Sequence, residues 1–516
     1  MESKSKVWRK LILTFSCMIF MLAIWPPLAS SAGGKSKASP ETSAQQIPLT
    51  LRECLALAVE NNLDIIIARH DPQAAETAIA EQKAAFHPLA SMDLTKENKD
   101  TPLPSSVQVF TRGAFKAIED EMIDFNWAIS QRFVTGSEYR VSFHNLRNAN
   151  TYNRFNSEYI TNTFFSFKQH LLRNFGFDVN KAEINIARNN RDISQYEFVR
   201  QVLDIIAQVE NTYWDLVFTN EDLQVKKKSL ELAKDLLERN RIQVEVGTLA
   251  PIEILEAQTQ VAAREEEIIR AEKVVKDNED RLRKLINSQA ISLLKDVTIV
   301  PQDKPSSQKI EVSLEKSVQD ALEKRPEYLQ AKTNLENRNI QLGFSKNQLL
   351  PVVDLVAGIG TLANQGNFGN SLQDIVSGDN EDWRVGISVE IPLGTQLAKS
   401  RYTRSRIENE KALFELENLK QNIIIEVKEA VREIETNLKR TEVTRISSRL
   451  HQERLDAEDK RFSVGLSTSR DILEDQEQLV EALSRELLAV IDYRKSLVNL
   501  ERSKGTLLET RKIKTF

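Results

Sequence analysis

The chain has few of the residues on which most metal sites, disulfide frameworks and nucleophilic enzymes depend. Its 516 residues include two cysteines and five histidines, and none of them are paired at the spacing of metal ligands. The sequence Gly34-Lys35-Ser36 lacks the upstream glycine of a phosphate-binding loop, and no Gly-x-Ser-x-Gly sequence occurs. We therefore expect neither an enzyme nor a protein that binds a cofactor or a metal ion.

Glycine and proline are also scarce, at 16 and 14 residues, and they are concentrated in a few places. Charged residues make up 28% of the chain and apolar residues 41%, a composition typical of long helices with solvated faces. The net charge of -5 is small for this length, so it gives no reason to expect nucleic acid as a partner.

Long apolar runs are missing except at the N-terminus. Basic residues within 4–10 precede an apolar run over 11–25, which is followed by small residues. This order predicts a secretory signal peptide over 1–32, cleaved after Ala32. An uncleaved inner-membrane anchor is the alternative, although the run is short for a full span. Residues 33–47 are expected to form a disordered leader, and any later membrane segment must consist of strands.

Apolar residues recur at strict seven-residue steps along two long segments. The first segment carries Val202, Val209, Leu216, Leu223, Leu230, Leu237 and Val244, and the second carries Ile254, Val261, Ile268, Val275 and Leu282. This spacing predicts helices that keep one seam against a neighbour over many turns. A helix over 179–246 would be roughly 100 Å long, too long for a compact core. We expect a helical hairpin over about 179–288.

The chain contains an internal repeat. Residues 50–88 align with 313–351, and residues 246–258 align with 464–476. The two offsets differ by 45 residues, which indicates an insertion of that length in the first half, before the long helix. We expect a first repeat over 48–300 and a second over 301–508, with a second helical hairpin over about 396–508. The last residues, 509–516, are expected to be a tail.

Between the shorter helices and the long hairpins, the apolar period changes from helical to two. Val385, Ile387 and Val389 alternate with polar residues, and aromatic residues alternate in the same way over 125–143. Such alternation predicts strands with one apolar face. The expected strands lie at about 89–97, 124–146 (the inserted hairpin), 158–170, 352–360 and 382–393, with loops at 98–123, 147–157 and 361–381.

Two architectures would explain these strands, a soluble sandwich and a transmembrane barrel. The aromatic apolar face, together with short turns at one end and long loops at the other, favours the barrel. Four to six strands are too few to close a barrel, since the smallest barrels use about eight. Several chains would therefore share one barrel.

A further set of sequences occurs in a fixed order along the chain. It comprises LTLRECLALA at 49–58 followed by Asn61-Asn62, Phe86-His87-Pro88, QHLLRNFG at 169–176, Tyr213-Trp214-Asp215-Leu216, and the turns at 246–248 and 464–467. In order, duplication and spacing, these motifs resemble the TolC-like outer-membrane efflux protein family over about 48–510. The resemblance implies a mixed α+β membrane protein with two internal structural repeats per chain. It also implies a homotrimer whose transmembrane β-barrel continues into a long periplasmic α-helical barrel.

The resemblance further implies an export duct in the outer membrane of a Gram-negative bacterium. One end of the duct would be in contact with outer-membrane lipid, and a large portion would lie in the periplasm. Its partners would be a periplasmic adaptor (membrane fusion) protein and an inner-membrane efflux pump or ABC transporter. A stand-alone diffusion porin and a periplasmic coiled-coil scaffold are the alternatives. His170 stands where many relatives have proline. If the inserted hairpin joins the wall, as we expect, a trimer has eighteen strands rather than twelve.

The candidate site lies at the two turns that end the long helices. The residues expected to dock the adaptor are Val246, Gly247, Thr248, Val464, Gly465, Leu466 and Ser467, and the two glycines are expected to cap the preceding helices. Asp471 and Glu474 follow the second turn. Either their carboxylates stabilise the helix by lying near the positive end of its dipole, or threefold symmetry makes them an acidic entrance ring, as the resemblance implies.

Overall fold

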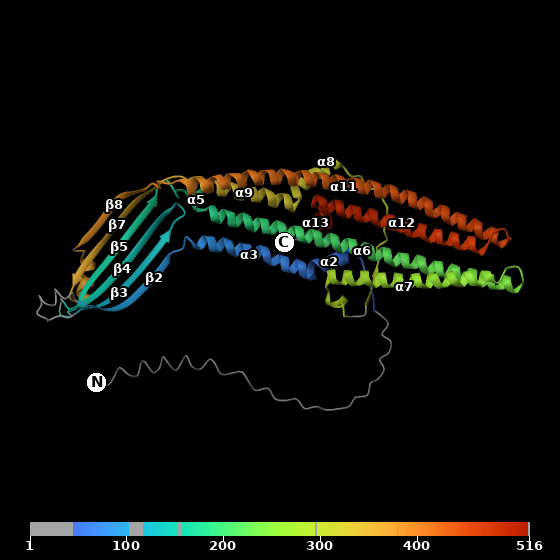
Figure 1. The fold of residues 1–516 in the computed structure, drawn as a ribbon, viewed down its shortest axis with the longest axis horizontal. Helices are drawn as coiled ribbons and strands as arrows, with labels where there is room; N and C mark the ends of the chain where they lie inside the picture. Colours follow the sequence, from blue (N-terminus) through green and yellow to red (C-terminus); the bar gives the residue numbers. More distant parts are fainter. Residues whose placement is uncertain are drawn as a thin grey trace, which may run out of the picture. The chain divides into compact units, whose positions relative to one another are not determined.

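The computed structural model of the chain describes residues 45–102, 117–151, 154, 156–294, 297–378 and 380–513. The expected signal peptide and most of the expected leader lie outside these residues. One compact unit, Gln46–Phe516, contains a β-sheet that lies at one end of a set of long helices (Figure 1). Within the described part of the chain, no helix is both long and apolar enough to span a membrane.

Six antiparallel strands form one sheet in the order β2-β3-β4-β5-β7-β8. The strands are β2 (Leu89–Pro102), β3 (Ala117–Arg132), β4 (Ser137–Asn150), β5 (Glu158–His170), β7 (Val352–Gln365) and β8 (Glu381–Glu390). The inserted hairpin, β3 and β4, lies between β2 and β5 and pairs with both. It therefore belongs to the same sheet as the other strands.

Register places most of the large apolar side chains of the six strands on one face. Trp127 lies opposite Met92 on one side and Phe143 on the other, and Ile359 lies opposite Phe165 and Trp383. Because side chains alternate along a strand, the intervening residues form the second face, which is mostly polar and on which Arg384 lies over the ring of Phe164. The polar residues on that face include Asp124, Asn126, His144, Asn162, Asp382 and Arg384.

The strands extend further from the helices than the sequence pattern predicts, and the expected loops are shorter. β2 and β3 enter the segment 98–123, of which 103–116 lie outside the described residues, and β4 enters 147–157. In the segment 361–381, β7 continues to Gln365 and a helix follows, α10 (Phe368–Ser377). Paired residues at these outer ends, such as Lys99 and Asp120, are polar. The outer ends of the strands therefore lack the alternation of apolar and polar residues that predicts a strand.

Six helices form the helical part of the unit. They are α3 (Leu63–Ala84), α6 (Ala182–Glu245), α7 (Ile252–Ile286), α9 (Pro326–Asn347), α11 (Gln396–Ser463) and α12 (Ser469–Lys504). α6 packs against α3 and α9 in the part near the sheet, and against α7 and α12 further away; α11 packs against α9 and then α12 (Figure 1). With 64 and 68 residues, α6 and α11 are each roughly 100 Å long.

Shorter elements surround the middle of the long helices. They are β1 (Gln45–Leu49), α2 (Leu51–Asn61), the 3₁₀ helix η1 (Gln289–Ile291), β6 (Val297–Pro301), α8 (Leu314–Lys324) and α13 (Leu507–Thr510). β1 pairs with β6 and begins inside the segment expected to be a disordered leader. Its partner lies about 250 residues away in the sequence, so local composition carried no sign of the pairing.

The bend between the sheet and α6 contains one short helix, α5 (Phe177–Asn180). His170, the last residue of β5, lies with its Nδ1 atom 2.6 Å from Oδ1 of Asp354 on β7. The next residue, Leu171, donates its backbone N–H to the carbonyl oxygen of Val353 at 2.8 Å. The end of β5 is thus tied to the neighbouring strand by a side-chain contact and a backbone bond.

The predicted seven-residue seam of α6 is buried over its first half and then shifts. Val202, Val209 and Leu216 are almost completely buried. Leu230 and Leu237 are only half-buried, and the preceding residues, Ser229 and Leu236, are buried in their place. The partners of α6 change along its length, from α3 and α9 near the sheet to α7 and α12 further away (Figure 1), so a different side of the helix is buried in its second half.

Candidate functional site at the hairpin tips

The turn after α6 is stabilised by backbone hydrogen bonds that require a left-handed residue. Thr248 donates its N–H to the carbonyl oxygen of Gln243 at 2.8 Å, and Gly247 donates to that of Val244 at 3.0 Å. These two bonds constitute a Schellman motif. Gly247 has φ +80°, a conformation that a residue without a Cβ atom adopts at little cost.

The turn after α11 has the same geometry. Leu466 donates its N–H to the carbonyl oxygen of Arg461 at 2.9 Å, Gly465 donates to that of Phe462 at 3.0 Å, and Gly465 has φ +79°. The Arg461 guanidinium also donates to the carbonyl oxygen of Leu466 at 3.2 Å. Both predicted glycine positions thus adopt the conformation that ends a helix. We name the two turns, residues 246–248 and 464–467, the hairpin tips.

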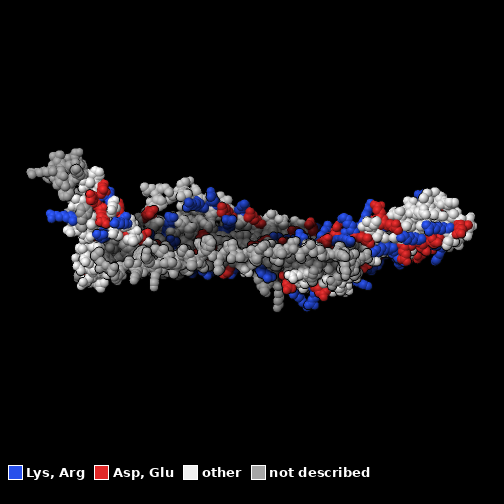
Figure 2. All heavy atoms as spheres, turned by 90° about the horizontal axis from the view of Figure 1, so that it is seen from below, with Lys and Arg blue, Asp and Glu red and all other residues white. Residues whose placement is uncertain are grey.

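Apolar side chains at the hairpin tips are open to solvent. Val246, Val464 and Leu466 are 67%, 68% and 69% exposed. Beside them, Lys, Arg, Asp and Glu are interspersed over the tip end of the helices on the face shown in Figure 2. Because the charges are of both signs, this surface presents isolated apolar groups among balanced charges rather than a strong field of one sign.

Asp471 is part of the helix cap of α12. Its carboxylate accepts hydrogen bonds from the hydroxyl and the N–H of Thr468 at 2.7 and 3.1 Å, while its own N–H donates to the Thr468 hydroxyl at 3.3 Å. This reciprocal pair is a capping box. The hydrogen bonds from Thr468, first from its side chain and then from its backbone, lower the pKa of the Asp471 carboxyl below its usual value. Asp471 therefore stabilises the first turn of α12 by direct hydrogen bonds.

Glu474 lies one turn further along α12 and is exposed. Its one hydrogen bond given by the structure comes from Gln478, whose Nε2 lies 3.2 Å from Glu474 Oε1. Glu458 of α11, which was not among the predicted site residues, also lies beside the second tip. Glu458 accepts a hydrogen bond from the Ser467 hydroxyl at 2.5 Å and pairs with Arg461 at 3.0 Å. The three-residue spacing of Glu458 and Arg461 on one helix was the signal available in the sequence.

Near their tips, the two hairpins pack against each other within one chain. Arg239 of α6 lies 2.7 Å from Asp459 of α11. An apolar cluster beneath this ion pair joins α6, α11 and α12, and it consists of Leu236, Leu455, Phe462, Ile472, Leu473 and Leu479. Both tips are consequently held at the end of one packed four-helix layer.

Removing the cap of α12 is expected to loosen only the tip. Thr468→Ala should cost about 1 kcal/mol in the first turn, because the Asp471 N–H loses its acceptor. Hydrogen exchange at the first amides bonded within the helix, residues 472–474, should then become roughly fivefold faster. Thr468→Ser retains the hydroxyl and should exchange at the original rate. Equal exchange in Thr468→Ala and the unaltered chain would show that this cap contributes nothing.

A comparison with known families bears on the role of these tips. A family model described as outer membrane efflux protein matches residues 139–288 and 317–506, which are more than half of the chain and include both tips. The chain belongs to the outer membrane efflux protein family. The resemblance to TolC-like proteins is thereby confirmed. This efflux protein is a channel of the outer membrane that serves export and has a large periplasmic portion, and it is not an enzyme.

Individual relatives are similar to this efflux protein over most of its length. The outer membrane protein TolC of Vibrio cholerae is 22% identical over 321 residues, which are 61% of this chain and 70% of TolC. The CmeC outer membrane channel of Campylobacter jejuni has a TM-score of 0.64 and 15% identity, with 94% of each chain covered. The open state of the MtrE outer membrane channel of Neisseria gonorrhoeae has a TM-score of 0.60 and 14% identity, with 89% of each chain covered. The solved structures share the fold.

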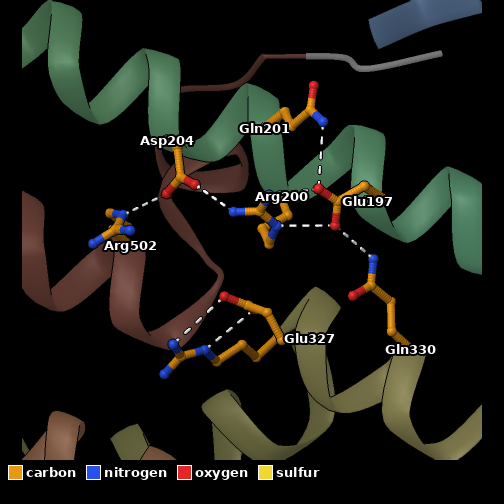
Figure 3. A network of polar contacts seen from close by, with 8 residues as sticks. Glu197, Arg200, Gln201, Asp204, Glu327, Gln330 and Arg502 are labelled. Carbon is orange, nitrogen blue, oxygen red and sulfur yellow. Dashed lines mark hydrogen bonds and ion pairs between the residues drawn. The ribbon is translucent and has the colours of Figure 1, made fainter. Parts of the chain in front are cut away.

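A second polar site of the efflux protein lies where α9 begins beside α6 and the end of α12 (Figure 3). Glu197 accepts hydrogen bonds from Arg200 at 3.0 Å and from Gln330 of α9 at 2.9 Å, and these bonds, chiefly those from Arg200, lower its pKa to about 2. Asp204 pairs with Arg200 at 3.0 Å and with Arg502 of α12 at 2.7 Å. The network therefore joins three helices through ionised groups.

Among the described residues, no group of three or more His, Cys, Asp or Glu side chains comes close enough together to hold a metal ion. Cys54 is a free, fully buried thiol, and its burial raises its pKa to about 12.

Proposed function

We propose that three copies of the chain form one export channel, in which a transmembrane β-barrel continues into a periplasmic α-helical barrel. The observation that carries this proposal is the state of the edge strands: β2 and β8 are exposed along their entire lengths. Within lipid, the unpaired N–H and C=O groups of a sheet edge have no water to bind. Pairing β8 of each copy with β2 of the next removes every edge, and three six-stranded sheets give a barrel of eighteen strands.

The apolar face of the sheet would contact outer-membrane lipid, and the polar face would line the lumen. Trp383, Val385 and Ile387 on the apolar face are 70%, 66% and 67% exposed, which supports this orientation. Strands that alternate between apolar and polar residues are what a membrane barrel with a water-filled interior requires.

The two halves of the chain, 48–300 and 301–508, are proposed to be structural repeats. α2 and α8 each have 11 residues, and α3 and α9 each have 22. In each half these helices are followed by strands and by a helical hairpin with a Schellman turn at its tip. The additional hairpin of β3 and β4 distinguishes the first half.

We assign docking of a periplasmic adaptor to the hairpin tips. Through that adaptor, an inner-membrane efflux pump or an ABC transporter would deliver the exported substrate to the channel. The exposed Val246, Val464 and Leu466 support this assignment, because exposed apolar groups on a rigid turn gain free energy when a partner covers them. Gly247, Thr248, Gly465 and Ser467 would set the backbone shape that the adaptor meets.

Mass and fractionation test the assembly. Protein extracted in detergent should have the mass of three chains, and a monomeric mass would contradict the shared barrel. Extraction from membranes without detergent would favour the periplasmic scaffold instead. Export that depends on a partner pump separates this channel from a diffusion porin, since a porin would conduct equally without the pump.

Asp471 and Glu474 are proposed to form two rings of three carboxylates at the periplasmic entrance. Replacing both by alanine should lower the preference of the reconstituted channel for cations, because a ring of carboxylates concentrates cations at a constriction. Single-channel reversal potentials in a salt gradient measure this preference. Thr468→Ala is the matched control, since it disrupts the same cap while leaving both carboxylates. Unchanged selectivity in the double variant would rule out the ring.

A further inference from the structure

The connection between β7 and β8 contains a well-defined helix at the end of the sheet that lies away from the long helices (Figure 1). This helix, α10, is capped at both ends. The Asn367 side chain accepts a hydrogen bond from the N–H of Gly369 at 2.7 Å, and Gly378 ends the helix with φ +75°. With 10 residues and both caps, α10 is an ordered element rather than part of an irregular outer loop.

α10 is attached to the apolar face of the sheet. The Ser371 hydroxyl lies 2.9 Å from the hydroxyl of Thr161, which also accepts a hydrogen bond from the Asn145 amide at 2.7 Å. The Phe368 ring packs against Tyr159 with ring centroids 6.1 Å apart. Because side chains alternate along a strand, Thr161 and Asn145 lie on the face that carries the apolar residues of β5 and β4.

The level at which α10 is attached is the outer boundary of that apolar face. Phe143 and Phe165 lie further toward the long helices, whereas Lys96 and Glu121, on the same face beyond them, form an ion pair at 3.2 Å. A change from aromatic to charged side chains marks the transition from hydrocarbon to the aqueous side. α10 lies at this transition.

One side of α10 is apolar and uncovered. Phe368, Leu372 and Val376 follow one another at four-residue spacing and are 42%, 41% and 82% exposed. Residues four apart lie on the same side of a helix. The opposite side carries Asn370, Gln373 and Ser377, all exposed. α10 is thus amphipathic, and its apolar side continues the apolar face of the sheet.

We propose that α10 is an interfacial helix that inserts Phe368, Leu372 and Val376 among the acyl chains of the outer leaflet. Asn370 and Gln373 then face the headgroups, as in other amphipathic helices at membrane surfaces. The inference rests on the proposed function, since it requires the apolar face of the sheet to face lipid. The occupant is lipid rather than a second copy, because α10 packs on β5 and β7, whereas copies join through the edge strands β2 and β8. The helix fixes how deeply the barrel sits in the membrane.

Fluorescence quenching tests this placement in the full chain. Single cysteines are introduced as Val376→Cys, Gln373→Cys and Val385→Cys, labelled with an environment-sensitive fluorophore, and reconstituted into phosphatidylcholine vesicles. The unaltered chain gives the labelling background, because its Cys54 is fully buried. A phosphatidylcholine with a nitroxide near the glycerol end of its acyl chain should remove most of the emission at position 376, and one with the nitroxide further along the chain should do so at position 385, which lies deeper on the sheet. Aqueous iodide should instead quench position 373.

Each outcome decides the proposal. A blue-shifted, nitroxide-quenched label at 376 beside an iodide-quenched label at 373 supports it. Equal quenching at 373 and 376, or quenching of 376 by iodide alone, overturns the proposal for α10. If the nitroxide still quenches the label at 385 in that case, the proposed membrane barrel stands. Disulfide-linked dimers of Val376→Cys would identify a second copy as the occupant and overturn the proposal for α10 as well. If the nitroxide fails to quench 385, the proposed barrel fails together with the inference.

Discussion

Replacing Leu466 by glutamate is expected to abolish export while leaving the amount and folding of the efflux protein unchanged. The side chain is 69% exposed at its tip, so the substitution breaks no internal packing. If Leu466 is covered by an adaptor, a carboxylate there would be buried without a partner. Truncation of such an anchor costs about 2 kcal/mol or more, which is roughly a thirtyfold loss of affinity, and a buried charge adds to this cost.

Two measurements accompany this prediction. Export is scored in a strain that lacks the native copy, and adaptor capture is measured with the purified channel. Leu466→Met keeps an apolar side chain of similar volume and should retain both. Normal export by the glutamate variant would remove Leu466 from the docking surface. Loss of export with normal adaptor capture would assign Leu466 to a later step than docking.

Helices and strands whose apolar residues recur at a regular spacing could be predicted from the local sequence. The seven-residue spacing predicted both arms of the first hairpin, and its buried residues Val202, Val209 and Leu216 lie on the predicted seam. The prediction fails at Leu230 and Leu237, where Ser229 and Leu236 are buried instead, because this half of α6 packs against α7 and α12 rather than against α3 and α9 (Figure 1). A strict heptad therefore locates a helix better than it locates the helix's contacts.

Elements without an apolar period were missed. The outer ends of β2 and β3 include pairs of polar residues, such as Lys99 with Asp120, and β1 depends on a partner far along the chain. α10 was expected to be a loop because its segment contains Gly366, Gly369 and Gly378 among polar residues. Its caps and its contact with Thr161 decide the conformation, and the latter is a tertiary interaction invisible to local composition.

At the hairpin tips too, local features could be predicted from the sequence and a long-range contact could not. Glycine after a long helix predicted both turns, because few other residues tolerate positive φ. Thr468 followed three residues later by Asp471 is the pattern of a capping box, and it explains the hydrogen bonds of that carboxylate. The contact of Arg239 with Asp459 joins residues 220 positions apart. No local signal could have indicated it.

The second large effect is expected at the end of the chain, where Arg511 binds Glu210 of α6. The guanidinium Nε and Nη2 atoms lie 2.8 and 2.6 Å from the two carboxylate oxygens, and Glu210 is 2% exposed. Arg511→Ala leaves a buried carboxylate without its cation, which costs about 3–5 kcal/mol in a sealed site. The Arg511 side chain is 30% exposed, so water reduces the expected loss to about 2–3 kcal/mol in the free energy of unfolding.

Denaturant unfolding of the detergent-solubilised protein measures this loss, and two variants control it. Lys324→Ala breaks the more exposed pair of Lys324 with Glu509, whose atoms lie 2.6 Å apart, and should cost less than about 1 kcal/mol. The double variant Glu210→Met, Arg511→Ala removes both charges and should recover most of the stability, since no unpaired buried charge remains. If Arg511→Ala were no more destabilising than Lys324→Ala, the ion pair would not hold the C-terminal segment against α6. If the double variant were as unstable as the single one, packing by the arginine side chain, and not its charge, would be what stabilises that segment.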